Sequence, residues 1–147
     1  MIPTHIVIHH SASSLEVTFE QIREHHLSRG WIDIGYHFVI DQKGLVTKGR
    51  TEDMVGAHAL GINQVSLGIC LIGNFDEHDP TAEQFSSLCN LIQDLAQRKK
   101  IIPENIIGHC DVTCEERGFR KSRCPGENLY CRLEELRQLV GKASLEE

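Results

Sequence analysis

The pattern of apolar and polar residues along the chain predicts a series of strands. Residues 5–8 form a short apolar run that is typical of a buried strand and ends in a pair of histidines. Residues 66–73, SLGICLIG, form a continuous apolar run between polar residues and glycine, which predicts a central strand. In residues 35–50, apolar and polar residues alternate on either side of the turn DQKG, which predicts a hairpin. A last short strand is expected at residues 105–109.

Helical patterns lie between and after these strands. Thr18 with Gln21, and Thr81 with Gln84, have the spacing of a capping box, in which the two side chains bond to each other's backbone N–H groups. Apolar residues then recur at helical spacing. The predicted helices are residues 18–29, 81–100 and 128–140. With no internal repeat or linker, the whole pattern predicts one α/β domain over residues 1–147, with a central mixed sheet flanked by helices.

Composition narrows the classes of function. A chain of 147 residues suits one domain, and a net charge of -6 argues against binding to a nucleic-acid backbone. No apolar run approaches the roughly 18 residues of a membrane span, so we expect no membrane partner. The first strand begins almost at once and leaves no room for a signal peptide. We therefore expect a cytoplasmic location unless the protein is released by lysis or another route.

Candidate metal ligands lie near the predicted strand ends. His9 follows the first predicted strand, His109 ends the last one, and Cys124 lies in the loop before the last helix. Two imidazoles and a thiolate are good zinc ligands, and three protein ligands leave one position for water or substrate, which is typical of a catalytic site. Spacing alone does not single out this set among nine histidines and six cysteines.

A second metal hypothesis uses cysteines only. Cys110, Cys114, Cys124 and Cys131 could together hold a structural zinc, but their C-x3-C-x9-C-x6-C spacing fits the usual ligand pattern poorly. In an oxidising compartment, Cys114 could instead form a disulfide with Cys110 or Cys131. Under the all-cysteine hypothesis the two histidines would have no role.

Several motifs of the chain occur in an order that points to a known family. They are VIHHSAS, RGWIDIGYHFVI, VGAHALGINQVSLGICLIGNFD, IIGHCDV and CPG. In this order the chain resembles the type 2 N-acetylmuramoyl-L-alanine amidases, the superfamily of phage lysozyme-like amidases and peptidoglycan recognition proteins. The resemblance spans residues 5–126 and implies the lysozyme-like amidase fold. It also implies that His9, His109 and Cys124 bind Zn²⁺.

The resemblance implies a reaction and a substrate as well. The reaction is hydrolysis of the amide between N-acetylmuramic acid and L-alanine in peptidoglycan or muropeptides. Tyr36, in the motif GYHF, matches a tyrosine beside the metal that would hydrogen-bond the attacking water or the developing oxyanion. His58 matches a family histidine on the groove side, and it or Asn63 is expected to contact the substrate.

Two positions depart from the family pattern. Cys70 stands where the branch that recycles muropeptides has a glutamate thought to act as base. Ser122 stands where many members have lysine and some have threonine, and its neighbour Lys121 could also reach the site. Either residue could therefore assist catalysis. The alternative function is a binding domain that does not cleave; such relatives typically lack the cysteine ligand, whereas this chain retains Cys124 and Tyr36.

Overall fold

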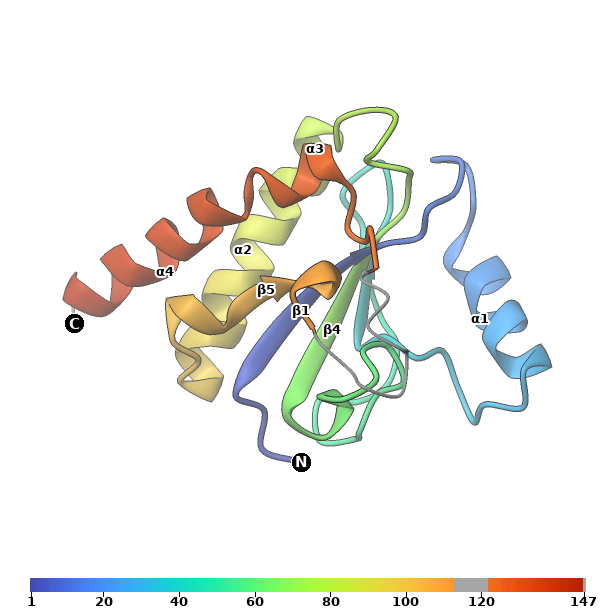
Figure 1. Cartoon of the computed structure of the whole chain (residues 1–147), viewed down its shortest axis with the longest axis horizontal. Helices are drawn as coiled ribbons and strands as arrows, with labels where there is room; N and C mark the ends of the chain where they lie inside the picture. Colours follow the sequence, from blue (N-terminus) through green and yellow to red (C-terminus); the bar gives the residue numbers. More distant parts are fainter. Residues whose placement is uncertain (113–121, 147) are drawn as a thin grey trace.

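The computed structural model of the chain describes residues 1–112 and 122–146 (Figure 1). In this part of the chain, five strands form one sheet in the order β3-β2-β4-β1-β5. Neighbouring strands are parallel except for β3, which runs antiparallel to β2. The strands are β1 (His5–His10), β2 (Phe38–Ile40), β3 (Val46–Lys48), β4 (Ser66–Leu71) and β5 (Ile106–Gly108). The predicted α/β fold with a central mixed sheet is confirmed.

Both predicted capping boxes are present at helix N-termini. Thr18 begins α1 (Phe19–Ser28), and its hydroxyl accepts the backbone N–H of Gln21 at 3.2 Å. Thr81 begins α2 (Ala82–Lys99) in the same way, with Gln84 at 3.0 Å. None of the helices in the described ranges is long and apolar enough to cross a membrane. The short 3-10 turns are η1 (Asn63–Val65), η2 (Pro103–Asn105) and η3 (His109–Asp111).

The last predicted helix is divided in two, which corrects the single helix expected at residues 128–140. The two parts are α3 (Glu127–Tyr130) and α4 (Leu133–Glu146). Between them the backbone N–H of Arg132 bonds to the carbonyl of Leu129, three residues back, at 3.0 Å. In this turn the Arg132 guanidinium lies over the Phe85 ring, with its Cζ 3.5 Å from the ring centroid, in a cation–π contact. The predicted apolar stripe is nevertheless buried: Leu129, Leu133, Leu136 and Val140.

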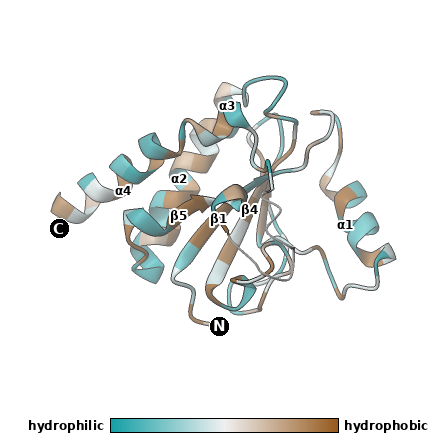
Figure 2. Ribbon diagram, in the orientation of Figure 1, coloured by the Kyte–Doolittle hydropathy of each residue, from teal (hydrophilic) through white to brown (hydrophobic). Residues whose placement is uncertain are grey.

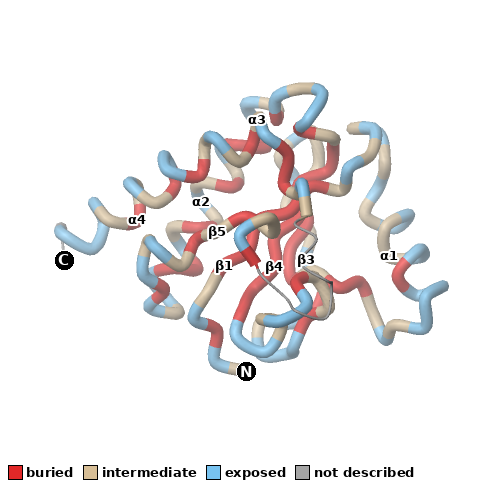
Figure 3. The backbone as a smooth tube through the Cα atoms, in the orientation of Figure 1, coloured by how far each residue is buried: buried red, intermediate tan, exposed pale blue. Residues whose placement is uncertain are grey.

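One face of the sheet is covered by α2 and α4 (Figure 1). Alternate residues of the central strands point to this side, where they meet the apolar stripes of the two helices. Figure 2 shows hydrophobic residues along β1, β4 and β5, and Figure 3 shows these strands as mostly buried. The main core therefore lies between the sheet and these helices.

The opposite face carries α1 and the residues that build the site. Cys70 of β4 packs there in a smaller apolar cluster with Phe19 and Ile22 of α1. Because side chains alternate along a strand, His9 lies on this face, whereas His10 points to the α2 side. His9 is paired in register with Cys70. The carboxyl ends of β1 and β4 thus place His9 and Cys70 side by side.

Candidate metal centre

The three predicted metal ligands come together in space. His9 comes from the end of β1, His109 from the first position of η3, and Cys124 from the segment before α3. Their ligand atoms all lie within 4.8 Å of one another, and the Cys124 Sγ lies 3.6 Å from the His9 Nδ1. Two imidazole nitrogens and one thiolate sulfur form a donor set that suits zinc. The residues therefore fit the metal that the sequence predicts.

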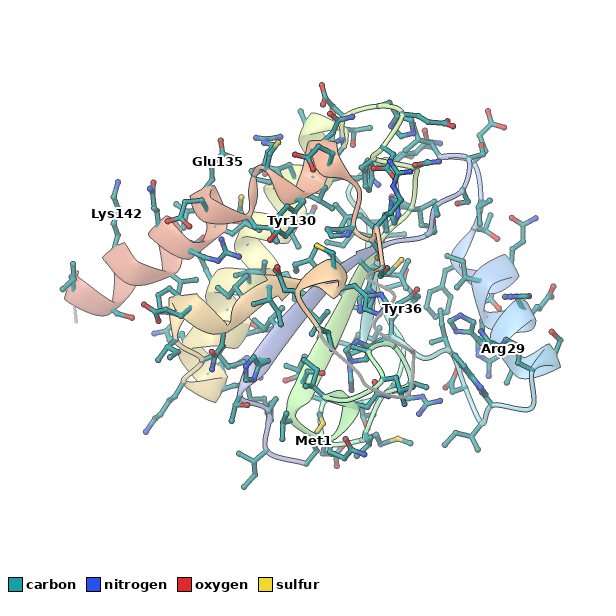
Figure 4. All side chains as sticks on the ribbon, in the orientation of Figure 1. Met1, Arg29, Tyr36, Tyr130, Glu135 and Lys142 are labelled. Carbon is teal, nitrogen blue, oxygen red and sulfur yellow. The ribbon has the colours of Figure 1, made fainter. Side chains whose placement is uncertain are left out.

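Main-chain pairing places His109 beside His9. Strand β5 pairs with β1, with Gly108 opposite Ile8, so His109, the first residue after β5, lies next to His9, with 4.7 Å between the ring centroids. The Asp111 carboxylate then closes the η3 turn, accepting the Gly108 N–H at 3.0 Å through Oδ2 and the Tyr130 hydroxyl at 2.6 Å through Oδ1. Figure 4 labels Tyr130 near the ribbon of α3. The turn that carries His109 is therefore attached to α3 as well as to the sheet.

Cys124 accepts a hydrogen bond from the backbone beside the first ligand. The backbone N–H of His10 points at the Cys124 Sγ, with 3.2 Å between nitrogen and sulfur. An N–H group that points at sulfur favours the thiolate form, which is the form that binds metals. The side chain of His10 is used elsewhere, because its Nδ1 accepts the Phe75 N–H at 3.2 Å. His10 thus supports the site through its backbone, and its ring is on the far side of the strand.

Tyr36, which is labelled in Figure 4, stands beside His9. The centroids of the two rings are 5.1 Å apart. Burial raises the pKa of its hydroxyl well above the usual range, and the neighbouring Cys70 and Cys124 thiols add to this effect. Its hydroxyl donates a hydrogen bond to the Cys70 thiol, whose own pKa is raised by burial. Tyr36 therefore stays protonated and can act as a hydrogen-bond donor.

Two buried groups, His26 and Arg50, hold the backbone that precedes Tyr36. The N–H of Gly35 donates to the His26 Nδ1 at 2.9 Å, and burial lowers the pKa of His26 to about 4. The Arg50 guanidinium donates to backbone carbonyls, including those of Ile34 and Val55 at 2.9 Å each. Because a buried hydrogen-bonded group resists displacement, these contacts fix the segment that presents the tyrosine.

His58 and Asn63, the predicted substrate contacts, both make bonds within the protein. The His58 Nδ1 lies 2.9 Å from the His9 Nε2, and burial lowers the pKa of His58 to about 3. The Asn63 Oδ1 accepts the backbone N–H groups of His58 at 3.0 Å and Ala59 at 2.8 Å. A substrate contact by either residue stays a prediction.

Two of these contacts are not predicted by the sequence. One joins His58 to His9 across 49 positions, and the other joins Tyr36 to Cys70. Each pair spans two segments that only the fold brings together. The apolar run around Cys70 is a signal for its burial, but no pattern marks its hydroxyl partner.

Ser122 lies at the rim of the site, and its hydroxyl accepts the backbone N–H of Cys124 at 3.1 Å. Lys121, the alternative assisting residue, lies outside the described residues, as does Cys114 of the all-cysteine hypothesis. The described cysteines are thiols rather than disulfides, namely Cys70, Cys89, Cys110, Cys124 and Cys131. Within the described ranges, Cys124 is the cysteine that belongs to a potential metal-binding group, and its partners in that group are two histidines.

An open cleft of about 430 Å³ gives access to the ligands. Its rim carries an ion pair between Arg123 and Asp76, with 3.7 Å between the charged groups. A second hollow of about 230 Å³, next to α1, shares Tyr36 with the cleft. The cleft is lined by His9, His10, Ala12, Tyr36, His58, Asn74, Asp76, His109, Ser122, Arg123 and Cys124. Polar groups thus surround the position where a metal and a polar substrate would meet.

Comparison with known proteins agrees with this geometry. Residues 1–127 match the model of a family described as N-acetylmuramoyl-L-alanine amidase. The endolysin of Enterobacteria phage K11 is 39% identical over 113 residues, which are 71% of this chain and 73% of that protein. Peptidoglycan-recognition protein SC2 of Drosophila melanogaster is 34% identical over 136 residues, 86% of this chain and 70% of that protein. The solved structure of N-acetylmuramoyl-L-alanine amidase LysC from Clostridium intestinale is 35% identical, with a TM-score of 0.82 over 96% of this chain and 87% of that one.

Proposed function

This chain belongs to the N-acetylmuramoyl-L-alanine amidase family, and we propose that it is a zinc-dependent enzyme that hydrolyses the amide between N-acetylmuramic acid and L-alanine. The substrate would be peptidoglycan or the muropeptides derived from it. The observation that carries this proposal is the meeting of His9, His109 and Cys124 at a cleft that also contains Tyr36. A protein that only binds peptidoglycan has no need of such a donor set.

The chain's own residues would divide the work. His9, His109 and Cys124 would hold the metal, and the His10 N–H would keep the Cys124 sulfur as thiolate. Zinc, when bound, supplies a Lewis acid and lowers the pKa of a bound water towards about 7. Tyr36, protonated because of its burial, would turn its one hydroxyl hydrogen from the Cys70 thiol to the amide oxygen as negative charge develops there.

Two further residues are proposed to assist. The Ser122 hydroxyl already accepts the Cys124 N–H and has its own hydrogen to donate towards the cleft. Lys121 precedes it in sequence and would supply a positive charge near the same oxygen. Because no carboxylate occupies the position of Cys70, no general base is assigned there.

Release of new L-alanine amino termini from purified peptidoglycan tests the proposal. We expect release by the zinc-loaded protein, loss of release with a chelator and recovery when zinc is added back. Tyr36→Phe should keep its zinc and lose on the order of a hundredfold in kcat, as expected when one donor to a developing oxyanion is removed. Near-normal turnover in this variant would remove the role given to Tyr36.

Matched cysteine variants identify the metal ligands. Cys124→Ala should lose both bound zinc and activity, whereas Cys131→Ala removes an exposed thiol outside the proposed site and should keep both. Under the all-cysteine hypothesis, Cys131→Ala would lose the metal and His9→Ala would retain it. If the zinc-loaded protein sediments with peptidoglycan but releases no alanine termini, it is a binding domain and the enzyme proposal is wrong.

A further inference from the structure

A chain of hydrogen bonds leads from a backbone carbonyl to the first metal ligand. The Ser66 Oγ lies 2.7 Å from the Ile62 carbonyl oxygen and 3.3 Å from the His58 Nε2. The other ring nitrogen of His58, Nδ1, lies 2.9 Å from the His9 Nε2. The remaining nitrogen of His9, Nδ1, is the one that faces the Cys124 sulfur. Four groups are thus linked in a line that ends at the metal position.

The carbonyl at the far end fixes the direction of every bond in this line. A carbonyl can only accept, so the single hydroxyl hydrogen of Ser66 is directed to Ile62. Ser66 must then accept from the His58 Nε2, which places the proton of a neutral His58 on Nε2 and leaves a lone pair on Nδ1. His9 must donate to that lone pair from Nε2. The lone pair of His9 is then on Nδ1, where the metal would bind.

Packing leaves the His58 ring little freedom to leave this arrangement. A side chain on Gly68 would place its Cβ 2.6 Å from the His58 Cγ, and one on Gly56 would lie 2.7 Å from the His58 Cδ2. The backbone of His58 is held by Asn63 at 3.0 Å. These close approaches hold the ring where it meets His9.

We propose that His58 and Ser66 are positioning residues that set the tautomer of His9, so that its Nδ1 lone pair is directed to the metal before the metal arrives. A ligating histidine generally donates its other N–H to an acceptor, and loss of that acceptor typically weakens metal binding about 10- to 100-fold. Here the acceptor is a neutral imidazole. The importance of the metal rests on the proposed function, but the tautomer is a property of the protein alone.

Nitrogen NMR of the histidine rings in the metal-free protein tests the tautomer directly. In ¹⁵N-labelled wild type at neutral pH, we expect His9 to show a protonated Nε2 and an unprotonated Nδ1, and His58 to show the same pattern. The His9 signals are assigned by their loss in His9→Gln. A protonated Nδ1 on His9 in the wild type would overturn the inference, whatever the enzyme does.

Zinc affinity, measured by competition with a chromophoric chelator, provides the second readout. His58→Leu removes the acceptor and should bind zinc about 10- to 100-fold more weakly. His58→Asn places an amide oxygen near the former Nδ1 and should recover part of the affinity. Ser66→Ala should give a mixture of His9 tautomers and a smaller loss. His5→Leu, at the opposite end of β1, is the control and should bind zinc as the wild type does.

The outcomes separate this inference from the proposed function. Unchanged zinc affinity in His58→Leu, with a raised KM, would mean that His58 contacts substrate and would contradict the positioning role. Failure to release alanine termini, with the expected tautomer and zinc affinities, would contradict the enzyme proposal and leave the positioning role intact. If His58→Leu does not fold, the wild-type spectrum and Ser66→Ala still decide.

Discussion

The backbone N–H of Cys110 donates a 2.7 Å hydrogen bond to the carbonyl of Cys124, so the segments that carry His109 and Cys124 are joined directly by their main chains. The Cys124 Sγ is in turn held by the His10 N–H. Hydrogen bonds donated by main-chain N–H groups therefore link all three ligand segments. These bonds form only when the turns hold the main chain in the right place. The geometry of the proposed metal site should therefore depend on the groups that shape these turns.

The hydrogen-bonded pair Tyr130 and Asp111 is the first group that shapes one of these turns. Tyr130→Phe removes a 2.6 Å hydrogen bond to a carboxylate and should lower the free energy of unfolding by about 1 kcal/mol, since the pair is partly exposed to solvent. Zinc affinity should fall by less than about tenfold, because Asp111 still holds the Gly108 N–H. Urea denaturation and zinc competition measure the two effects.

Asp111→Ala is the comparison variant for that prediction. It removes the bonds to both Gly108 and Tyr130, so the η3 turn loses its closing contact. The loss of zinc affinity should be larger than in Tyr130→Phe. Equal zinc affinity in the two variants would show that the turn needs no carboxylate to present His109.

Gly126 is the second group, and it has a matched control. Its φ is 88°, and a Cβ there would lie 2.6 Å from the Phe75 carbonyl carbon. Gly126→Ala should therefore destabilise the protein by more than the roughly 1–2 kcal/mol that a left-handed backbone costs an alanine, and should weaken zinc binding by moving Cys124. The control is Gly141, inside α4, where a Cβ would lie at an ordinary contact distance of 3.8 Å from the Pro103 Cγ.

Gly141→Ala should accordingly stabilise the protein by about 0.5–1 kcal/mol, as alanine generally does in a helix interior. Thermal or urea denaturation of both variants tests the difference in sign. A neutral or stabilising effect at Gly126 would contradict the account of the turn that follows Cys124.

His26 should make stability depend on pH. Its pKa is lowered from 6.5 to about 4 in the folded protein, because burial favours the neutral ring that accepts the Gly35 N–H. The unfolded chain thus takes up a proton at a higher pH than the folded protein does. The stability contributed by neutral His26 is complete above pH 6.5 and is lost as the pH falls towards about 4.

His26→Asn keeps an acceptor for Gly35 but does not titrate, and should reduce the loss of stability between pH 7.5 and 5 by about 1 to 2 kcal/mol relative to wild type. Urea denaturation at both pH values provides the measurement. An unchanged dependence in His26→Asn would mean that His26 is not the group responsible.

Local signals predicted much of the fold. The capping boxes at Thr18 and Thr81 involve residues three positions apart, so their chemistry is complete within the sequence and both formed as expected. The division of the last helix was not predictable in this way. It accompanies the contact of Arg132 with Phe85, which lies on a different helix, and no periodic pattern within residues 128–140 records that neighbour.

The site shows the same contrast. His9, His109 and Cys124 could be selected because whole motifs, rather than spacing, pointed to them, and the structure brings them within 4.8 Å. The neighbours that orient them could not be selected, because His58 reaches His9 only through the close approach of Gly68 on the next strand. A histidine beside a groove and a histidine beneath a ligand look alike in sequence.

Because side chains alternate along β1, the two adjacent histidines differ in how much each can reveal about metal binding in related proteins. His9 faces the cleft, whereas His10 contributes a backbone N–H to Cys124 and a ring nitrogen to Phe75. A backbone N–H is supplied by every residue except proline. Among relatives, a missing histidine at the first position should therefore mark loss of metal binding, while many residues at the second should be compatible with it.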